Sequence, residues 1–443
     1  MATSQFGTRP LAPALALFLA LTAAGAMVYY HLGFFIPSVL QNRALHGGGS
    51  GYSFGDDLYP VWLTTRQWRA QHLDLYGTEM TREIQTGLFG RPLDARNPND
   101  PATDYRQFAY PAFTDLILWP TSVVEFPKLR LVLAILLPLL TAVSIKFWIL
   151  ALDWRIRPVW LAAIVLLGLC NYELLEAFFA EQPGLLVGFF MASAALALRR
   201  NRLMLAGMLM SLTLIKPQMT LLATLYMLLW SVSDRRRARF WIGFFSVTIF
   251  MTVASLLIWP YWIKEWIGIL LGYHRYAMPP LISVLLGPAL NAVAGRAIIA
   301  LSLVASGALA WKNRGASPET EKFWLTLSLL LAVTTVAILP GQAIYDHVVL
   351  FPGIFLLIKN RREFLSAGKI PRTLLMAGTL VLFWPWISAA GLLIVHRWLM
   401  PNIFGSTAIF VLPIRTAASL PFAVLALLAW SWRLRLASNQ APA

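Results

Sequence analysis

The stretch Leu129–Leu150, LRLVLAILLPLLTAVSIKFWIL, predicts a helix that crosses a membrane. About 20 mainly apolar residues span the hydrocarbon core of a bilayer, and this run is of that length. The whole chain of 443 residues is 58% hydrophobic and only 13% charged, whereas a soluble protein is about half apolar and about a quarter charged. The composition therefore indicates a polytopic, all-helical membrane protein.

Similar apolar runs recur along the chain. The first, Leu11–Tyr30, has no cleavage pattern of small residues at its end, so we interpret it as a retained helix. The later runs are Leu129–Leu150, Val159–Cys170, Pro183–Leu198, Phe240–Trp259, Gly295–Trp311, Phe323–Leu339, Val348–Ile358, Thr373–Val395 and Ala408–Trp430.

The region Leu203–Trp230 is interrupted by Lys216-Pro217-Gln218 and has arginine clusters on both sides. A single span would place one of those clusters outside, against the positive-inside rule. Two short helices that meet at Pro217 would return the chain to the same side, and we favour this V-shaped pair over one span. A break at membrane depth must line a cavity or be packed by protein.

Counting the pair as two gives about twelve transmembrane segments in a single integral membrane domain, residues 1–443. The short loops on one side are basic, which predicts that they are cytoplasmic. The long segment 31–128 then forms a partly structured external loop that carries Asp56 and Asp57. The net charge of +16 is spread over loops between spans, where anionic lipid accounts for it, and this argues against nucleic-acid binding.

Asp56 and Asp57 lie in the motif Gly55-Asp56-Asp57-Leu58-Tyr59-Pro60-Val61-Trp62. One interpretation is that they are solvated loop acids that cap the helix beginning near Pro60. The other is that one carboxylate accepts a proton from a hydroxyl nucleophile.

Two further residues have a structural and a functional interpretation. Lys216 is a cation in an apolar region, where it either pairs with an acid or reaches an interface, or faces a functional cavity. His347, in Tyr345-Asp346-His347, is either an interfacial hydrogen-bonding residue or a donor to a phosphate oxygen.

Other polar and aromatic side chains are weaker candidates. Gln182 precedes Pro183-Gly184 and is a candidate to point into a cavity, while Glu173 and Glu176 are expected in a solvated turn. Arg296 is a candidate anion ligand. Tyr59 and Tyr110 are candidates for a platform that binds a sugar.

The ordered set of motifs resembles the bacterial family 87 glycosyltransferases, the mannosyltransferases that use polyprenol-phosphate-mannose. The motifs are Asp-Leu-Tyr-Pro-Val-Trp from Asp57, Leu75-Tyr76-Gly77, Phe108-Ala109-Tyr110-Pro111, Gln182 before a glycine-rich span, Leu214-Ile215-Lys216-Pro217-Gln218, and Tyr345-Asp346-His347 before Phe351-Pro352. They cover about residues 11–360. Glu181 departs from the pattern, since many relatives have glycine there.

The resemblance implies a membrane fold of the GT-C class and a catalytic carboxylate in the first external loop, with Asp57 matching better than Asp56. It also implies a polyprenyl-phosphate sugar donor, inversion at the anomeric carbon, and a donor-phosphate histidine at His347. Lys216 and Arg296 are expected to help bind that phosphate, and Asp56, Tyr59, Tyr110, Gln182 and Tyr345 to contact substrate. The acceptor would be a lipid or glycan hydroxyl at the external face of a bacterial plasma membrane.

The expected reaction needs neither a metal nor a cofactor, because the polyprenyl phosphate leaves with its own charge. Two other classes remain open from the sequence. A membrane transporter or a flippase for lipid-linked sugars would also place charged residues in broken helices. A noncatalytic membrane scaffold would have no charged cavity.

Overall fold

A computed structural model describes residues 11–45, 52–94, 96–97, 100, 105–273, 275, 277–398 and 412–438. These residues form helices joined by turns, with one isolated bridge between Pro280 and Pro340. The predicted all-helical class is therefore confirmed for the described part of the chain. Ala408, the expected start of the last apolar run, lies outside the described residues.

Six helical segments of the described chain are long and apolar enough to cross a membrane, or seven if a helix pair bent by 60° forms one more span. The six are α1 (Leu11–Tyr30) with η1 (His31–Phe35) and α2 (Ile36–Leu45), α6 (Phe126–Ala151), α12 (Ala238–Ile258) with η5 (Arg235–Arg237) before it, α14 (Leu281–Leu290) with η6 (Asn291–Gly295) and α15 (Arg296–Lys312), α19 (Lys369–Trp398), and α20 (Leu412–Ala417) with α21 (Ser419–Ser438). The bent pair is α7 (Pro158–Leu169) and α8 (Tyr172–Phe179).

The remaining helices are shorter. They are α3 (Tyr59–Gln71), α4 (Thr78–Phe89), α5 (Phe113–Leu118), η2 (Trp119–Val123), α9 (Gly184–Arg199), α10 (Leu203–Leu212), η3 (Thr213–Ile215), η4 (Pro217–Met219), α11 (Leu221–Val232), α13 (Trp262–Tyr273), α16 (Glu321–Ala337), η7 (Ile344–Leu350), α17 (Phe351–Lys359) and α18 (Arg361–Ser366).

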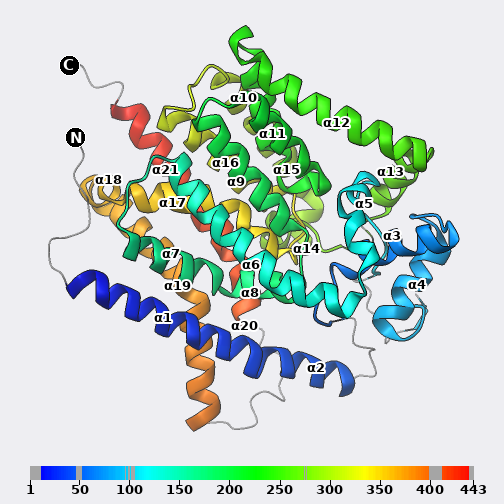
Figure 1. The fold of residues 1–443 in the computed structure, drawn as a ribbon. Helices are drawn as coiled ribbons and strands as arrows, with labels where there is room; N and C mark the ends of the chain where they lie inside the picture. Colours follow the sequence, from blue (N-terminus) through cyan, green and yellow to red (C-terminus); the bar gives the residue numbers. More distant parts are fainter. Residues whose placement is uncertain are drawn as a thin grey trace.

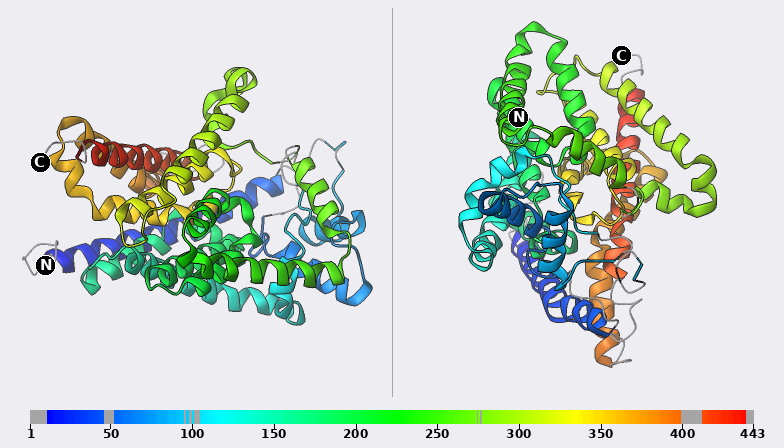
Figure 2. Two further views of the ribbon diagram at one scale, coloured as in Figure 1. Left: turned by 90° about the horizontal axis from the view of Figure 1, so that it is seen from above. Right: turned by 90° about the vertical axis from the view of Figure 1, so that its right-hand side faces the viewer.

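The segment 31–128, which the sequence predicts as an external loop, contains helices of its own. Helices α3, α4 and α5 gather at one end of the molecule, while the start of α1, the end of α21 and the basic helix α18 lie at the other (Figures 1 and 2). The basic helix α18 and the helices α3, α4 and α5 are thus at opposite ends of the molecule. The first apolar helix is longer than expected, because a π-helical turn at η1 continues it into α2.

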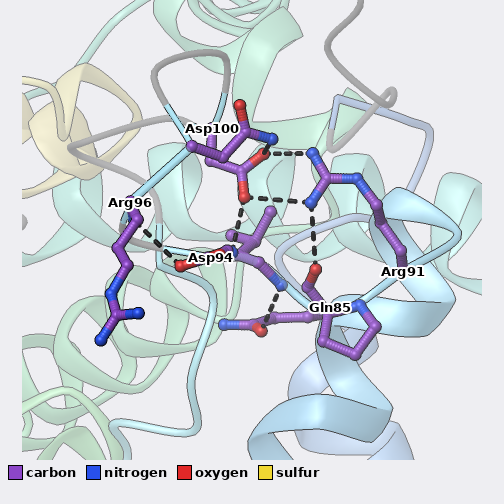
Figure 3. A network of polar contacts seen from close by, with 8 residues as sticks. Gln85, Arg91, Asp94, Arg96 and Asp100 are labelled. Carbon is purple, nitrogen blue, oxygen red and sulfur yellow. Dashed lines mark hydrogen bonds and ion pairs between the residues drawn. The ribbon is translucent and has the colours of Figure 1, made fainter.

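A polar network fixes the chain that follows α4 (Figure 3). Arg91 donates to Asp100 at 3.0 Å, and the backbone N–H of Asp94 donates to the same carboxylate at 2.6 Å. Gln85 on α4 accepts from the backbone of Leu93 at 2.9 Å and donates to the carbonyl of Tyr105 at 2.8 Å. The network therefore ties Leu93 and Tyr105, the residue before Arg106, to α4.

The region Leu203–Trp230 is broken where the sequence predicts a break. Helix α10 ends at Leu212, and two single turns, η3 and η4, flank Lys216 before α11 begins at Leu221. The residue before a proline is disfavoured in helical conformation, and Lys216 has φ −138° and ψ 73°. Arg202, before the pair, and Arg235, after it, line one pocket, so the chain enters and leaves at the same end. This geometry agrees with the V-shaped pair.

Two glycines let α10 and α12 approach backbone to backbone. A Cβ atom added at Gly207 would lie 2.0 Å from the carbonyl oxygen of Phe240, and one added at Gly243 would lie 2.2 Å from that of Met204. Ser211 and Thr248 then hydrogen-bond at 2.8 Å farther along the same helices. The two helices run in the same direction, since their first residues, Leu203 and Ala238, line the same arginine-rich pocket. This contact sets the position of helix α10, which leads to Lys216.

We expect Gly207→Ala to lower stability by more than about 2 kcal/mol, because the new methyl group overpacks against backbone that has no side chain to move aside. Gly307→Ala is the matched control, since nothing lies within 4 Å of a Cβ added at that helical glycine. The control should be neutral or stabilising by up to about 1 kcal/mol. Thermal-unfolding midpoints of the detergent-purified proteins compare the two. Equal midpoints would contradict the close approach of α10 and α12.

Candidate functional site

Asp56 and Asp57 lie in the turn before α3, and backbone hydrogen bonds tie this turn to the corner between α8 and α9. Gly55, which has φ +79°, donates to the carbonyl of Phe179 at 2.8 Å, and Asp57 donates to that of Ala180 at 3.2 Å. Leu58, and not an aspartate, is the N-cap of α3, and no side chain caps that helix. The capping interpretation of the two acids is therefore wrong.

Arg106 binds both neighbouring carboxylates. One guanidinium nitrogen lies 2.8 Å from Asp56 Oδ2 and the other lies 2.5 Å from Asp57 Oδ1. The Asp56 side chain is only 2% exposed, whereas that of Asp57 is 19% exposed. A buried carboxylate requires a paired cation, and Arg106 provides one for Asp56. Asp57 is thus the acid of the two that an incoming molecule reaches more easily.

Gln182 joins Asp57 to a second charged pair. Its amide nitrogen donates to Asp57 Oδ2, and its amide oxygen accepts from Lys216 Nζ at 3.3 Å. The hydroxyl of Tyr110 donates to the same amide oxygen at 3.5 Å. An amide has one donor end and one acceptor end, so a carboxylate on one side and an ammonium on the other fix its orientation. The sequence made Gln182 a candidate to point into a cavity, and the structure places it buried between Asp57 and Lys216.

Lys216 forms a buried ion pair with Asp346. Its Nζ lies 2.7 Å from Asp346 Oδ1, and the two side chains are 9% and 1% exposed. The ammonium also lies 5.0 Å from the ring centroid of Tyr345. The break at η3 and η4 places the lysine at this point, and η7 supplies both partners. Pairing with an acid, one of the two interpretations from the sequence, is what the structure shows.

The cluster contains three carboxylates and two cations, namely Asp56, Asp57 and Asp346 with Arg106 and Lys216. Burial raises the pKa of Asp346, while the Lys216 ammonium opposes this shift. Burial also raises the pKa values of Tyr110 and Tyr345 well above the ordinary value, and the negative charge of Asp57 adds to both shifts. The two phenols therefore remain protonated and keep a hydrogen to donate.

No hydrogen bond or ion pair in the described structure joins His347 to this cluster, although it follows Asp346 directly. It lines an apolar cavity of about 110 Å³ together with residues of α7, α17 and α19, among them Ile164, Phe351 and Phe383. Its Nδ1 has no hydrogen-bond partner among the described residues. Burial lowers the pKa of His347 to about 3, so the imidazole is neutral at physiological pH. It can donate or accept a hydrogen bond but adds no positive charge.

Two other predicted residues lie apart from the cluster. Arg296 is exposed at the start of α15, and no hydrogen bond or ion pair in the described structure joins it to these residues. Tyr59 packs in α3 with its ring 5.0 Å from that of Phe126 and 5.7 Å from that of Trp62. Its ring contacts therefore belong to the packing between α3 and α6, and its hydroxyl lies against Gly87 of α4.

The expectation that Glu173 and Glu176 lie in a solvated turn is wrong, since both are buried. Glu176 accepts from the hydroxyl of Tyr52 at 2.9 Å and lies 2.8 Å from Nε2 of His31, which π-helix η1 carries. The two glutamates of the apolar helix α8 are buried in the molecule, and His31 of η1 and Tyr52 are the partners of Glu176. Sequence spacing alone does not reveal such partners.

Glu181 lies directly behind the Asp56–Asp57 turn. It is 1% exposed, adopts φ +50°, and its carboxyl would lie 2.8 Å from a Cβ added at Gly55. Burial raises the pKa of Glu181 to about 8, although the charge of Arg130 opposes the shift. The carboxyl is therefore mainly neutral at neutral pH, and neither of its oxygens has a hydrogen-bond partner among the described residues.

Arg106 is the main residue of the cluster that the sequence analysis missed. Two adjacent acids with low exposure require a cation, and Arg106 lies two residues before the motif Phe108-Ala109-Tyr110-Pro111. That low exposure is known only from the structure, so the sequence itself held no signal for Arg106. Among the described residues, no three His, Cys, Asp or Glu side chains gather in a way that could hold a metal ion.

We expect Lys216→Met to destabilise the protein by about 3–5 kcal/mol, because it leaves the buried Asp346 carboxylate unpaired. Adding Asp346→Asn should restore much of the lost stability, since it removes the orphaned charge. Thermal unfolding in detergent measures each variant. Lys146→Met is the control, because Lys146 is an exposed lysine within α6. A double variant no more stable than Lys216→Met would contradict the coupling of the two charges.

The sequence profile of glycosyltransferase family 87 matches residues 108–340, which include Tyr110, Gln182 and Lys216. No curated protein and no solved structure matches the chain. The matched segment is more than half of the chain. The resemblance predicted from ordered motifs is thereby confirmed, and the chain belongs to glycosyltransferase family 87.

Proposed function

We propose that this glycosyltransferase moves a mannose-like sugar from a polyprenyl-phosphate donor to a lipid or glycan hydroxyl, with inversion at the anomeric carbon. Asp57 is the general base. The observation that carries the proposal is the position of Asp57: it is the more exposed of the two adjacent carboxylates and is hydrogen-bonded through Gln182 to the Lys216–Asp346 pair. A neutral hydroxyl is a poor nucleophile, and a positioned carboxylate assists it by removing its proton.

The proposed displacement follows from this arrangement. The acceptor oxygen attacks the anomeric carbon while its proton passes to the Asp57 carboxylate. The bond from the anomeric carbon to the phosphate oxygen breaks, and the electron pair leaves with the polyprenyl phosphate. Attack opposite the leaving group inverts the anomeric configuration.

Asp57 must give up one of its present contacts to act as the base, since Arg106 and Gln182 each hold one of its oxygens. Arg106 also binds Asp56 and keeps that partner when Asp57 turns toward an acceptor. In this proposal Asp56 is a positioning residue that anchors the guanidinium. Tyr110, Tyr345 and Gln182 border Asp57 and Lys216, and they contact the sugar or the acceptor.

The leaving phosphate gains charge and needs preorganised donors. We propose Lys216 and His347 as its ligands, with Arg296 available as a cation from outside the cluster. The neutral His347 donates a hydrogen bond, and the apolar cavity that it lines receives the first part of the polyprenyl chain. The cavity walls support this, because α7, α17 and α19 supply apolar side chains around the histidine.

We further propose that the chain has the GT-C architecture with twelve membrane segments. The six long helices and the bent α7–α8 pair make seven. The short helices α9, α10, α11, α16 and α17 add five, giving twelve. The basic loops would face the cytoplasm and Asp57 the periplasm of a bacterial inner membrane.

A transporter or flippase is the alternative, because a charged residue at a helix break is also typical of transporters. An assay with purified protein, radiolabelled polyprenyl-phosphate sugars and membrane-lipid acceptors separates the two. The glycosyltransferase must form a new covalent sugar–acceptor product. Movement of the lipid-linked sugar across a proteoliposome membrane without such a product would favour the alternative.

In that assay we expect Asp57→Asn to lower turnover by on the order of a thousandfold, the range that general-base catalysis supplies. Asp56→Asn should cost less than about tenfold, because an amide still accepts a hydrogen bond from Arg106. Expression and donor binding should stay near those of the wild-type protein in both variants. Full activity of Asp57→Asn would exclude this residue as the base, and equal losses would point to a proton shared by the pair.

We expect His347→Ala to lower turnover about a hundredfold, comparable with the loss of one oxyanion donor. His347→Asn is the matched variant, because it keeps an N–H group at the wall of the cavity and should recover part of the rate. Initial rates and donor binding are measured for each. Normal rates and normal donor affinity in His347→Ala would remove this histidine from the phosphate site.

A further inference from the structure

An arginine-lined pocket of about 710 Å³ opens at the basic end of the molecule, where α10 and α12 begin. Its wall contains the side chains of Arg202, Arg235, Arg236 and Arg239, all of them exposed. Arg202 precedes α10, and the other three belong to η5 and the start of α12. The pocket is far along the chain from Asp57, and none of its residues takes part in the cluster described above.

The four guanidinium groups have no paired acid in the described structure. The nearest acid in sequence, Asp234, accepts instead from the backbone N–H of Arg236 at 2.9 Å. The parallel helices α10 and α12 also both present their N-terminal ends here, and a helix N-terminus favours negative charge. The pocket therefore offers a concentrated positive potential that nothing in the described protein neutralises.

An apolar surface continues from this pocket along the same two helices. Met204 and Leu205 on α10 are 43% and 42% exposed, and Ile242 and Phe245 on α12 are each 41% exposed. The segment Arg235–Ile258 is one of the candidate membrane spans. Its arginine-rich end thus lies where lipid headgroups meet the hydrocarbon core. A ligand that matches both parts must carry an anionic head and apolar chains.

We propose that this pocket is a binding site for an anionic phospholipid. The arginines bind the phosphate of the headgroup, and the acyl chains lie on the exposed faces of α10 and α12. Arginine suits this role because its planar guanidinium forms paired hydrogen bonds with phosphate oxygens. The close contacts at Gly207 and Gly243 hold α10 and α12 together, so the site is built into the packing of these two helices.

The test is titration of the detergent-purified, full-length protein with dioleoyl phosphatidylglycerol, with bound lipid counted by native mass spectrometry. Dioleoyl phosphatidylcholine is the neutral-lipid comparator. A basic residue near an anionic lipid surface contributes a factor of about five in affinity, so Arg235→Gln with Arg239→Gln should weaken phosphatidylglycerol binding about twentyfold. Binding of phosphatidylcholine should stay unchanged, and added salt should weaken only the binding of phosphatidylglycerol.

The matched control is Arg155→Gln with Arg157→Gln, which removes two exposed arginines from another basic loop. It should change the affinity by less than about twofold. Equal losses in the two double variants would overturn the proposal, as would equal binding of the two lipids. Displacement of phosphatidylglycerol by millimolar inorganic phosphate would also overturn it and assign the pocket to a free phosphate compound. If the double variant fails to fold, Arg236→Gln alone should still lower the affinity about fivefold.

Discussion

The buried ion pair between Lys216 and Asp346 joins the parts of the molecule that form the candidate site. Two charges taken out of water are stable only when each satisfies the other, and these two lie 2.7 Å apart with almost no exposure. Lys216 belongs to the break between α10 and α11, and Asp346 belongs to η7. Any arrangement that separated these elements would leave an uncompensated charge inside the protein. The pair therefore fixes the position of Lys216. Gln182 hydrogen-bonds both Lys216 and Asp57 and so positions Asp57 relative to the pair.

The break itself depends on backbone chemistry more than on the charge. Pro217 prevents the preceding residue from continuing a helix, and short single turns replace the missing helical hydrogen bonds. The arm α10 is then held by α12 at a distance that only glycines at Gly207 and Gly243 permit. Because α10 is held in place, the side chain of Lys216 has few accessible positions. A single carboxylate, that of Asp346, is consequently enough to pair with it.

Much of this could be predicted from the sequence, because the signals were local. Apolar runs predicted the helices, and Lys216-Pro217 between two arginine clusters predicted the V-shaped pair. The ordered motifs predicted the family. The residues that were missed or misplaced depend on contacts distant in sequence: Arg106 meets acids that lie 49 and 50 positions away, and Glu176 is buried against His31, which lies 145 positions away. Hydropathy and spacing contain no information on such pairings.

The charge balance of the cluster limits how the proposed reaction can proceed. Three carboxylates already face two cations, and Lys216 is held by Asp346. A donor phosphate adds further negative charge, while His347 is neutral and supplies only a hydrogen bond. Burial raises the pKa of Asp346 and the Lys216 ammonium opposes this shift, so turning the ammonium toward a phosphate would favour a proton on Asp346. In the proposed mechanism, donor binding and protonation of Asp346 are therefore linked. The same negative charge would favour retention of Arg106 near Asp56 while Asp57 turns toward the acceptor.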